Sequence, residues 1–320
     1  ARENRARYAW RAEALPRPAF TGRREVEGES VATLVPYIDW TFFFSAWELN
    51  MKFPKILDDP RLGAAARELY AHGRTLLDRI AKEELLRPRG AYGFWPANAD
   101  GEDLVLWTDA SRGAELARFP MLRQQGEIAD GKPNRSLVDY VAPVESGLVD
   151  HVGAFCVTAG HGVAELVAEF QADHDDYHAI LTKALADRLA EAFAERLHER
   201  VRREWGYAAD ETLSNEELID ERYRGIRPAF GYPACPDHRP KRRLLELLDA
   251  ESVGVTLTES MAMAPAASVS GLYLAHEDAR YFNVGRLGRD QVEDYARRTR
   301  ASLAETERWL GPSLGYEPRA

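Results

Sequence analysis

A long helix between Asp176 and Trp205 constrains the fold more than any other segment of the sequence. Apolar side chains recur at every fourth residue along it, while acidic side chains form a separate stripe, and this periodicity predicts one amphipathic helix. The apolar stripe contains Leu181, Leu185, Leu189, Phe193, Leu197 and Val201, and the acidic stripe contains Asp187, Glu191 and Glu195. We therefore expect the helix to pack against a sheet or another helix.

The other periodic segments predict shorter helices and clusters of strands. Asp59 is the expected N-cap of a helix over 60–84. Ser214 and Ser302 each precede a glutamate at capping-box spacing, so a helix is expected to begin at each of them. Residues 288–300 are expected to form an exposed helix. Short apolar runs bounded by turn residues predict strands over 92–98, 104–109, 151–160, 253–260 and 268–276. Because helices interrupt the strands irregularly and no glycine-rich phosphate loop follows a strand, we expect an α+β fold with long helices flanking a mostly antiparallel sheet.

The first 30 residues differ from the rest of the chain. They are rich in arginine and lack a periodic apolar pattern, which is typical of a linker. The first dense apolar block spans 35–49, so we expect 1–30 to be a lead-in and 31–320 to form one domain. Since the chain does not begin with methionine, we also expect it to be a piece of a longer protein.

Charge and cysteine content exclude several classes of function. The net charge is -10, whereas nucleic-acid-binding proteins concentrate Lys and Arg, so we expect no nucleic-acid partner. Cys156 and Cys235 are the only cysteines, too few for a disulfide framework or a four-cysteine zinc site, which favours a reducing, cytoplasmic setting. No apolar run approaches the roughly 20 residues that span a bilayer, so we expect no membrane association.

Two segments contain histidines that resemble metal ligands. His174 and His178 are four residues apart, as in the H-E-x-x-H helix of zinc peptidases, which makes a zinc hydrolase an alternative function. Asp175 replaces the catalytic glutamate and no third ligand is identifiable, so a solvated helix start is favoured. Cys235 and His238 lack a second pair of donors, and we expect no metal site in this chain.

The segment from Glu221 to His238 is the best candidate for a binding site. Its sequence, ERYRGIRPAFGYPACPDH, combines prolines and glycines with aromatic and charged residues, which excludes a regular helix or central strand and favours a rigid loop. Arg227 is suited to a bidentate pair with a carboxylate, and the backbone near Ala229 and Gly231 allows a ligand to approach closely. A purely structural loop, packed by its aromatic residues, is the alternative.

This loop resembles the signature of a known family. RGIRPAFGYPACPDH is similar to the R-P-A-P-G-Y-P-A-C-P motif of the reactivation domain of cobalamin-dependent methionine synthase, which binds S-adenosylmethionine (AdoMet). Further similar blocks occur in family order between Val31 and Tyr316, among them YIDWTFFFSAWEL, YGFWPAN, LTESMAM, ASVSGLYLAH and ERWLGPSLGY. The resemblance implies a single, curved, C-shaped domain.

The resemblance also implies which residues contact AdoMet. Asp39 is expected to meet the ammonium group and Arg227 the carboxylate, which suits the zwitterionic tail of the ligand. The other residues expected at the ligand are Ala229, Gly231, Tyr232, Tyr281 and Phe282, with Glu191 and Glu221 as peripheral acids. Phe230 replaces a proline of the motif and Phe282 stands where some members have a second tyrosine, which affects the expected shape of the adenosyl pocket.

A reactivation domain implies a specific reaction. AdoMet would supply its methyl group for reductive methylation of cob(II)alamin, which a separate cobalamin-binding domain carries, and a flavodoxin-type donor would supply the electron. The product, methylcobalamin, serves methionine synthesis, and no catalytic residue is expected in this chain because cobalt is the nucleophile. The basic run Arg239, Lys241, Arg242 and Arg243 is a candidate docking surface for the flavoprotein. A non-catalytic AdoMet sensor or interaction module is the remaining alternative.

Overall fold

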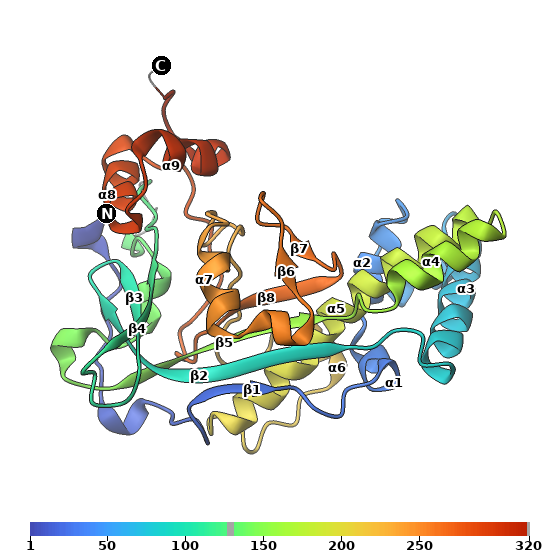
Figure 1. Cartoon of the computed structure of the whole chain (residues 1–320), viewed down its shortest axis with the longest axis horizontal. Helices are drawn as coiled ribbons and strands as arrows, with labels where there is room; N and C mark the ends of the chain where they lie inside the picture. The colour runs from blue at the N-terminus through green and yellow to red at the C-terminus, as the bar shows by residue number, and fades with distance from the viewer. Residues whose placement is uncertain (127–130, 319–320) are drawn as a thin grey trace.

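An open antiparallel sheet of six strands lies at the centre of the computed structural model, which describes residues 1–126 and 131–318 (Figure 1). The strands are β1 (Gly22–Glu25), β2 (Arg89–Asp100), β3 (Asp103–Trp107), β4 (Glu115–Pro120), β5 (Asp150–Thr158) and β8 (Ser268–Tyr273). Their order is β4-β3-β2-β5-β8, and β1 pairs with the first half of β2. The expected α+β fold on an antiparallel sheet is confirmed.

The two central strands alternate their side chains between the faces of the sheet. Strands β2 and β5 pair from Arg89 opposite Thr158 to Ala97 opposite Asp150. On one face the sheet buries Tyr92, Phe94 and Phe155, and on the other it buries Ala91, Trp95 and Cys156. This alternation is the period of two that defines a strand, and it gives the sheet a separate hydrophobic core on each face.

The first core lies between the sheet and the long helix α5 (Asp176–Glu204). All six residues of the predicted apolar stripe are buried in it, and Asp175 caps the helix by accepting a hydrogen bond from the backbone N–H of His178 at 3.0 Å. The same core packs against α1 (Val31–Leu34), α2 (Trp40–Ser45), α3 (Gly63–Lys82) and α4 (Val163–Ala172). The helices predicted over 176–205 and 60–84 are therefore confirmed.

The second core fills the opposite face of the sheet and includes α7 (Pro240–Leu247) and the loop around Phe230. A third, smaller cluster joins α8 (Arg289–Thr299) to α9 (Leu303–Leu310). The expected capping serines precede α6 (Asn215–Ile219) and α9, where each accepts a hydrogen bond from the glutamate N–H three residues on. Short 3-10 helices occupy Arg2–Asn4, Ala12–Ala14, Val35–Tyr37, Lys55–Asp58, Leu137–Tyr140, Val144–Ser146, Ala250–Val253 and Gly311–Ser313.

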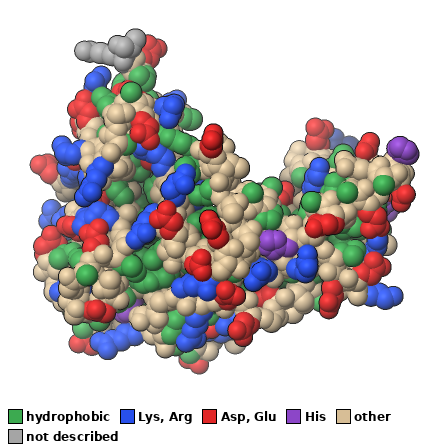
Figure 2. Space-filling model, in the orientation of Figure 1, with side chains coloured by type: hydrophobic (Ala, Val, Ile, Leu, Met, Phe, Trp, Pro, Cys, Tyr) green, Lys and Arg blue, Asp and Glu red, His purple; other side chains and the backbone are tan. Residues whose placement is uncertain are grey.

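The outline of the molecule is C-shaped, as expected. Helices α8 and α9 rise at one end of the sheet, and α3 and α4 rise at the other end on the same side (Figure 1). The space-filling view shows a hollow between these two ends (Figure 2). Among the described residues, no helix is both long and apolar enough to cross a bilayer.

The structure differs from the sequence-based expectation in three strands. Residues 22–25 form β1, so ordered structure begins before the apolar block at 35–49. Strand β4 was not predicted, and the strand expected over 253–260 is reduced to β6 (Thr256–Leu257), which pairs with β7 (Met263–Ala264). Strand β1 is polar and is held by backbone pairing with β2, which leaves no hydrophobic pattern to detect. The division into 1–30 and 31–320 remains a prediction, and its last two residues lie outside the described part.

Candidate functional site

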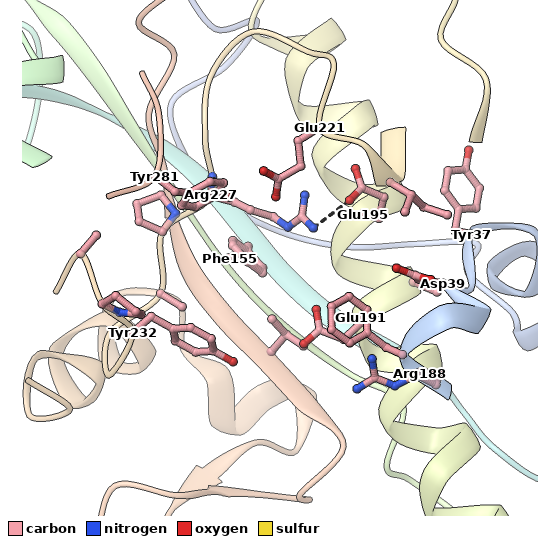
Figure 3. Close-up of a pocket in the computed structure, with 18 of the residues that line it drawn as sticks. Tyr37, Asp39, Phe155, Arg188, Glu191, Glu195, Glu221, Arg227, Tyr232 and Tyr281 are labelled. Atoms are coloured by element: carbon pink, nitrogen blue, oxygen red, sulfur yellow. Dashed lines mark hydrogen bonds and ion pairs between the residues drawn. The ribbon is translucent and has the colours of Figure 1, made fainter. Parts of the chain in front are cut away.

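A cavity of about 820 Å³ opens between α5 and the irregular loop that follows α6 (Figure 3). Helix α5, the segment before α2, the loop, the first residues of β8 and the segment 281–283 all contribute to its wall. Eight of the nine predicted ligand-contacting residues line it: Asp39, Glu191, Glu221, Arg227, Ala229, Tyr232, Tyr281 and Phe282. Residues from five distant parts of the chain are thus brought to one site.

Gly231 is the exception, because it does not line the cavity. Its backbone has a φ of +93°, and a Cβ at this position would lie 2.1 Å from the ring of His238. Only glycine adopts this left-handed conformation without strain. A side chain at this position would meet the His238 ring, so glycine serves the shape of the loop here, and contact of its backbone with a ligand remains a prediction.

Backbone hydrogen bonds hold the loop against the edge of the sheet. Ile226 exchanges two hydrogen bonds of 3.0 Å with Leu274, and the N–H of Leu272 donates to the carbonyl of Pro228 at 2.9 Å. Farther along, the N–H of Gly231 donates to the carbonyl of Cys235 at 2.8 Å. The loop thus continues the sheet beyond β8, and its position is fixed on both sides of Arg227.

Arg227 points from this loop into the space beside α5. Its Nη2 lies 2.7 Å from Oε2 of Glu195, and its Nη1 donates to the hydroxyl of Tyr223 at 2.6 Å. The hydroxyl of Tyr281 accepts a hydrogen bond from the backbone N–H of Arg227 at 3.0 Å. The guanidinium is therefore held at the cavity wall before any ligand arrives.

Burial perturbs the acid-base properties of this ion pair. Burial favours the neutral form of Arg227, but the Glu195 carboxylate outweighs that effect and raises the pKa of the guanidinium. Burial also raises the pKa of the Glu195 carboxyl, although Arg227 and Arg202 oppose that shift. Because arginine does not lose its proton in proteins, the Glu195 carboxyl lies beside a permanent cation.

The acids of the cavity come from three elements. Asp39 is the N-cap of α2, where its Oδ1 accepts a hydrogen bond from the N–H of Thr41 at 2.8 Å. Glu191 and Glu195 lie one turn apart on α5, and Glu221 follows α6 in a left-handed backbone conformation with a φ of 55°. In Figure 3, Glu221 and Glu195 lie on either side of the Arg227 guanidinium, and Asp39 lies near Glu191.

Exposed aromatic rings border the mouth of the cavity. Phe42 is 62% exposed and Tyr232 is 61% exposed, which is unusual for side chains of this size, and Tyr281 is also exposed. All three line the cavity. Phe282 is a further lining residue, so the departure from the family motif at this position does affect the pocket. Phe230 does not line the pocket, because it is buried in the second core against Phe119 at 5.6 Å between ring centroids.

Sequence reasoning missed several lining residues. Glu195, Tyr37 and Arg188 were not named as site residues, although all three line the cavity. A signal was available for Glu195, because it continues the acidic stripe of α5 from Glu191 at helical spacing. Glu195 is only 6% exposed, so this end of the stripe does not face water.

The histidines proposed as zinc ligands are not on one helical face. Helix α5 begins at Asp176, so His174 precedes the helix, and its φ of 57° turns the backbone away from helical geometry. His178 instead pairs through Nδ1 with Oδ2 of its neighbour Asp175 at 2.7 Å. Within the described ranges, no three side chains of His, Cys, Asp or Glu are grouped as a metal site would require.

Cys235 and the nearby basic run are also engaged within the protein. The thiol of Cys235 is buried and donates to the carbonyl of Ala229 at 3.0 Å. In the basic run, Arg239 pairs with the buried carboxylate of Asp237 at 2.7 Å, and Lys241 is buried and donates to the carbonyl of Met261 at 2.9 Å. The run is therefore not the continuous basic surface that a docking role would require.

Comparisons with known proteins identify the family of this chain. Residues 30–300 match the family described as vitamin B12 dependent methionine synthase, activation domain. A solved structure described as the MetH reactivation domain bound to AdoHcy is 50% identical in sequence and superposes with a TM-score of 0.95. The alignment covers 99% of this chain and 98% of that chain. On the extent of both matches, the chain belongs to the family of vitamin B12-dependent methionine synthase activation domains.

Proposed function

We propose that this chain binds AdoMet in the cavity between α5 and the Arg227 loop and supplies its methyl group for reductive methylation of cob(II)alamin. In the overall reaction, cob(II)alamin, AdoMet and one electron yield methylcobalamin and AdoHcy. The cobalamin is carried by the cobalamin-binding domain of methionine synthase, and a flavodoxin-type protein donates the electron. A cytoplasmic location remains a prediction from the cysteine content.

The charge of the cavity is the observation that carries the proposal. Its wall contains four carboxylates, from Asp39, Glu191, Glu195 and Glu221, but only two arginines, Arg188 and Arg227. AdoMet has two positive groups, the ammonium and the sulfonium, and one negative carboxylate, so it is a net cation that suits an acidic wall with one arginine fork. A volume of about 820 Å³ lies within the usual range for small-molecule sites.

Each charged group of the ligand has a matching group among the residues that line the cavity. The Arg227 guanidinium is placed to bind the carboxylate in a bidentate manner, and Asp39 is placed to bind the ammonium group. The faces of Tyr232 and Tyr281 provide cation-π partners for the sulfonium. When bound, AdoMet supplies the transferable methyl group, and the role of these residues is to orient it toward the cavity mouth.

Titration calorimetry tests the proposal. The intact chain is expected to bind AdoMet, and Arg227→Ala is expected to weaken binding by about 100-fold, because it removes a largely buried charge partner. Arg224→Ala is the matched control, because Arg224 lies in the same loop but bonds the carbonyl of Ala275 and does not line the cavity. Equal affinity of the intact chain and Arg227→Ala would refute the assigned carboxylate site.

The methyl-transfer step is tested separately. Mixing this chain with the cobalamin-binding domain, AdoMet and a one-electron donor should convert cob(II)alamin to methylcobalamin, which the absorption spectrum follows. The expected conversion requires all four components, and Arg227→Ala should slow it at low AdoMet concentration. AdoMet binding without conversion would favour the alternative of a non-catalytic AdoMet sensor.

A further inference from the structure

A cluster of buried polar side chains lies next to Arg227, where α5 meets the loop. Helix α5 presents Glu195, His198 and Arg202 at helical spacing along one face. The latter two are completely buried, and Glu195 is 6% exposed. Such a concentration of polar groups in a core is unusual and calls for a physical explanation.

Packing fixes the members of this cluster against each other. The ring of His198 stacks on that of Tyr273 at 5.0 Å between centroids, with an interplanar angle of 16°. Arg202 pairs with Glu211 at 2.6 Å, and its guanidinium lies 4.1 Å from the centre of the Tyr223 ring. Tyr223 in turn accepts the hydrogen bond from Arg227. Glu195 and Arg227 are thus held from α5 as well as from the loop.

Stability alone does not account for Glu195 in this position. Its Oε2 pairs with Arg227, but its Oε1 is buried and has no hydrogen-bond partner among the described residues. Three other atoms of the cluster are also buried without a hydrogen-bond partner among the described residues: Nε2 of His198, Nη1 of Arg202 and the hydroxyl oxygen of Tyr273. Leaving buried polar atoms unpaired costs free energy, and an apolar residue of similar volume would avoid that cost.

The cavity supplies a reason for the ion pair. Three further carboxylates, Asp39, Glu191 and Glu221, line the same space as the Arg227 side chain. A mobile guanidinium would pair with any of them, which would both displace the arginine and neutralise an acid. Glu195 pairs with Arg227 at 2.7 Å and so keeps the guanidinium at the cavity wall. The other three acids then remain available to the positive groups of the ligand.

We infer that Glu195 is a positioning residue: it orients Arg227 toward the ligand carboxylate and keeps that arginine away from the acids that meet the positive groups. The inference rests on the proposed AdoMet site. It assigns no contact with the ligand to Glu195 itself. The effect of Glu195 therefore depends on two partners, the guanidinium of Arg227 and the carboxylate of the ligand.

The test uses two ligands, AdoMet and decarboxylated AdoMet, which lacks the carboxylate. Glu195→Ala is expected to weaken AdoMet binding by about tenfold, because a misplaced arginine loses much of its bidentate contact. Binding of decarboxylated AdoMet should weaken less, by about threefold, because that ligand loses no contact with the guanidinium and is affected only where the released arginine pairs with the other acids. Glu195→Gln keeps an acceptor for Arg227 and should recover part of the lost affinity. In the Arg227→Ala background, Glu195→Ala should have no further effect.

Glu204→Gln is the matched control. Glu204 also lies on α5, where it accepts hydrogen bonds from Tyr92 at 2.8 Å and Arg200 at 2.8 Å, but it does not line the cavity. This variant should bind both ligands as the intact chain does. If Glu195→Ala fails to fold, Glu195→Gln carries the test, with a smaller loss for AdoMet and a still smaller one for the decarboxylated ligand.

The outcomes separate this inference from the proposed function. An intact chain that binds no AdoMet overturns the proposed function. An intact chain that binds AdoMet, with Glu195 variants that lose both ligands equally, overturns the inference and makes Glu195 merely structural. Unchanged binding of AdoMet by the Glu195 variants also overturns it.

Discussion

Arg123 and Arg227 are both arginines withdrawn from solvent, but they are bound in different ways. Arg123, just after β4, is 2% exposed, and its donors reach Glu102 at 2.9 Å, both oxygens of Asp139 at 2.7 Å and a backbone carbonyl at 2.7 Å. Arg227 keeps 16% of its side chain exposed, has one carboxylate partner, Glu195, and borders a cavity that contains further acids.

This difference in bonding partners distinguishes an arginine that stabilises the fold, Arg123, from one that is available to a ligand, Arg227. Four of the five N–H donors of Arg123 bond to two acids and a carbonyl, and Arg123 does not line the cavity. Arg227 uses part of its fork on Glu195 and Tyr223 and presents the rest to an open space. An arginine whose partners are incomplete beside a cavity is a better sign of a binding site than burial or charge alone.

Removing Arg123 should have the largest effect on stability. Arg123→Ala leaves Asp139 as a buried carboxylate without its ion-pair partner and Glu102 with only the more distant Arg2 at 3.8 Å, and this should lower the free energy of unfolding by about 3 to 5 kcal/mol. Urea denaturation measures the loss. AdoMet affinity of the folded fraction should be unchanged. Loss of affinity with unchanged stability would reverse the roles assigned to the two arginines.

Asp150 extends the comparison to a buried acid without an arginine partner. Its carboxylate accepts hydrogen bonds from the N–H groups of Ala142 and His151, and burial raises its pKa to about 6 from an ordinary value of 3.8. Because the folded state disfavours the ionised form, this group destabilises the protein by about 3 kcal/mol above pH 6, and that penalty disappears as the pH falls toward 3.8.

Asp150→Asn, which does not titrate, isolates this contribution. From pH 7.5 to pH 5, the stability of the unsubstituted protein should rise relative to that of Asp150→Asn by about 1 to 2 kcal/mol. Parallel urea denaturation of both proteins across that range measures the difference. A difference that is independent of pH, or that has the opposite sign, would mean that Asp150 is not destabilised by its burial.

Arg227→Lys tests whether the geometry of the fork matters at the cavity. Lysine keeps the positive charge but loses the planar pair of donors, so AdoMet affinity should fall by about tenfold, less than in Arg227→Ala. Calorimetry with AdoMet and with decarboxylated AdoMet measures the effect. Equal loss for both ligands would show that the carboxylate is not the group Arg227 recognises.

Substitution of a surface arginine is expected to have the smallest effect on stability and on AdoMet affinity. Arg242 is exposed on α7 and has no ion-pair partner among the described residues. Arg242→Glu should change the free energy of unfolding by less than about 0.5 kcal/mol and leave AdoMet affinity unaltered. Thermal denaturation and calorimetry check both expectations. A larger loss of stability would show that exposure alone does not distinguish this arginine from Arg123.

Much of the fold was predictable because its signals are local. The stripe of apolar residues along α5 and the short apolar runs of β2 and β5, bounded by turn residues, are both visible in any short window of the sequence. Strand β1 has no such signal, because its residues are polar and its pairing depends on β2, more than 60 residues away. The opposite error occurs near Thr256, where the sequence predicts a longer strand than the structure contains. There only two residues pair with β7, because β propensity depends on the surrounding contacts.

For the site, the sequence determined the residue types and the family motif, and eight of the nine residues expected at the ligand line the cavity. Only the tertiary structure decided that Gly231 faces His238, that His174 lies outside α5 and that Glu195 pairs with Arg227. The physical reason is that a motif specifies which groups are present, whereas burial, pairing and cavity shape depend on contacts between residues far apart in the chain. Glu195 and Arg227 are 32 positions apart, and no local pattern encodes the distance of 2.7 Å between them.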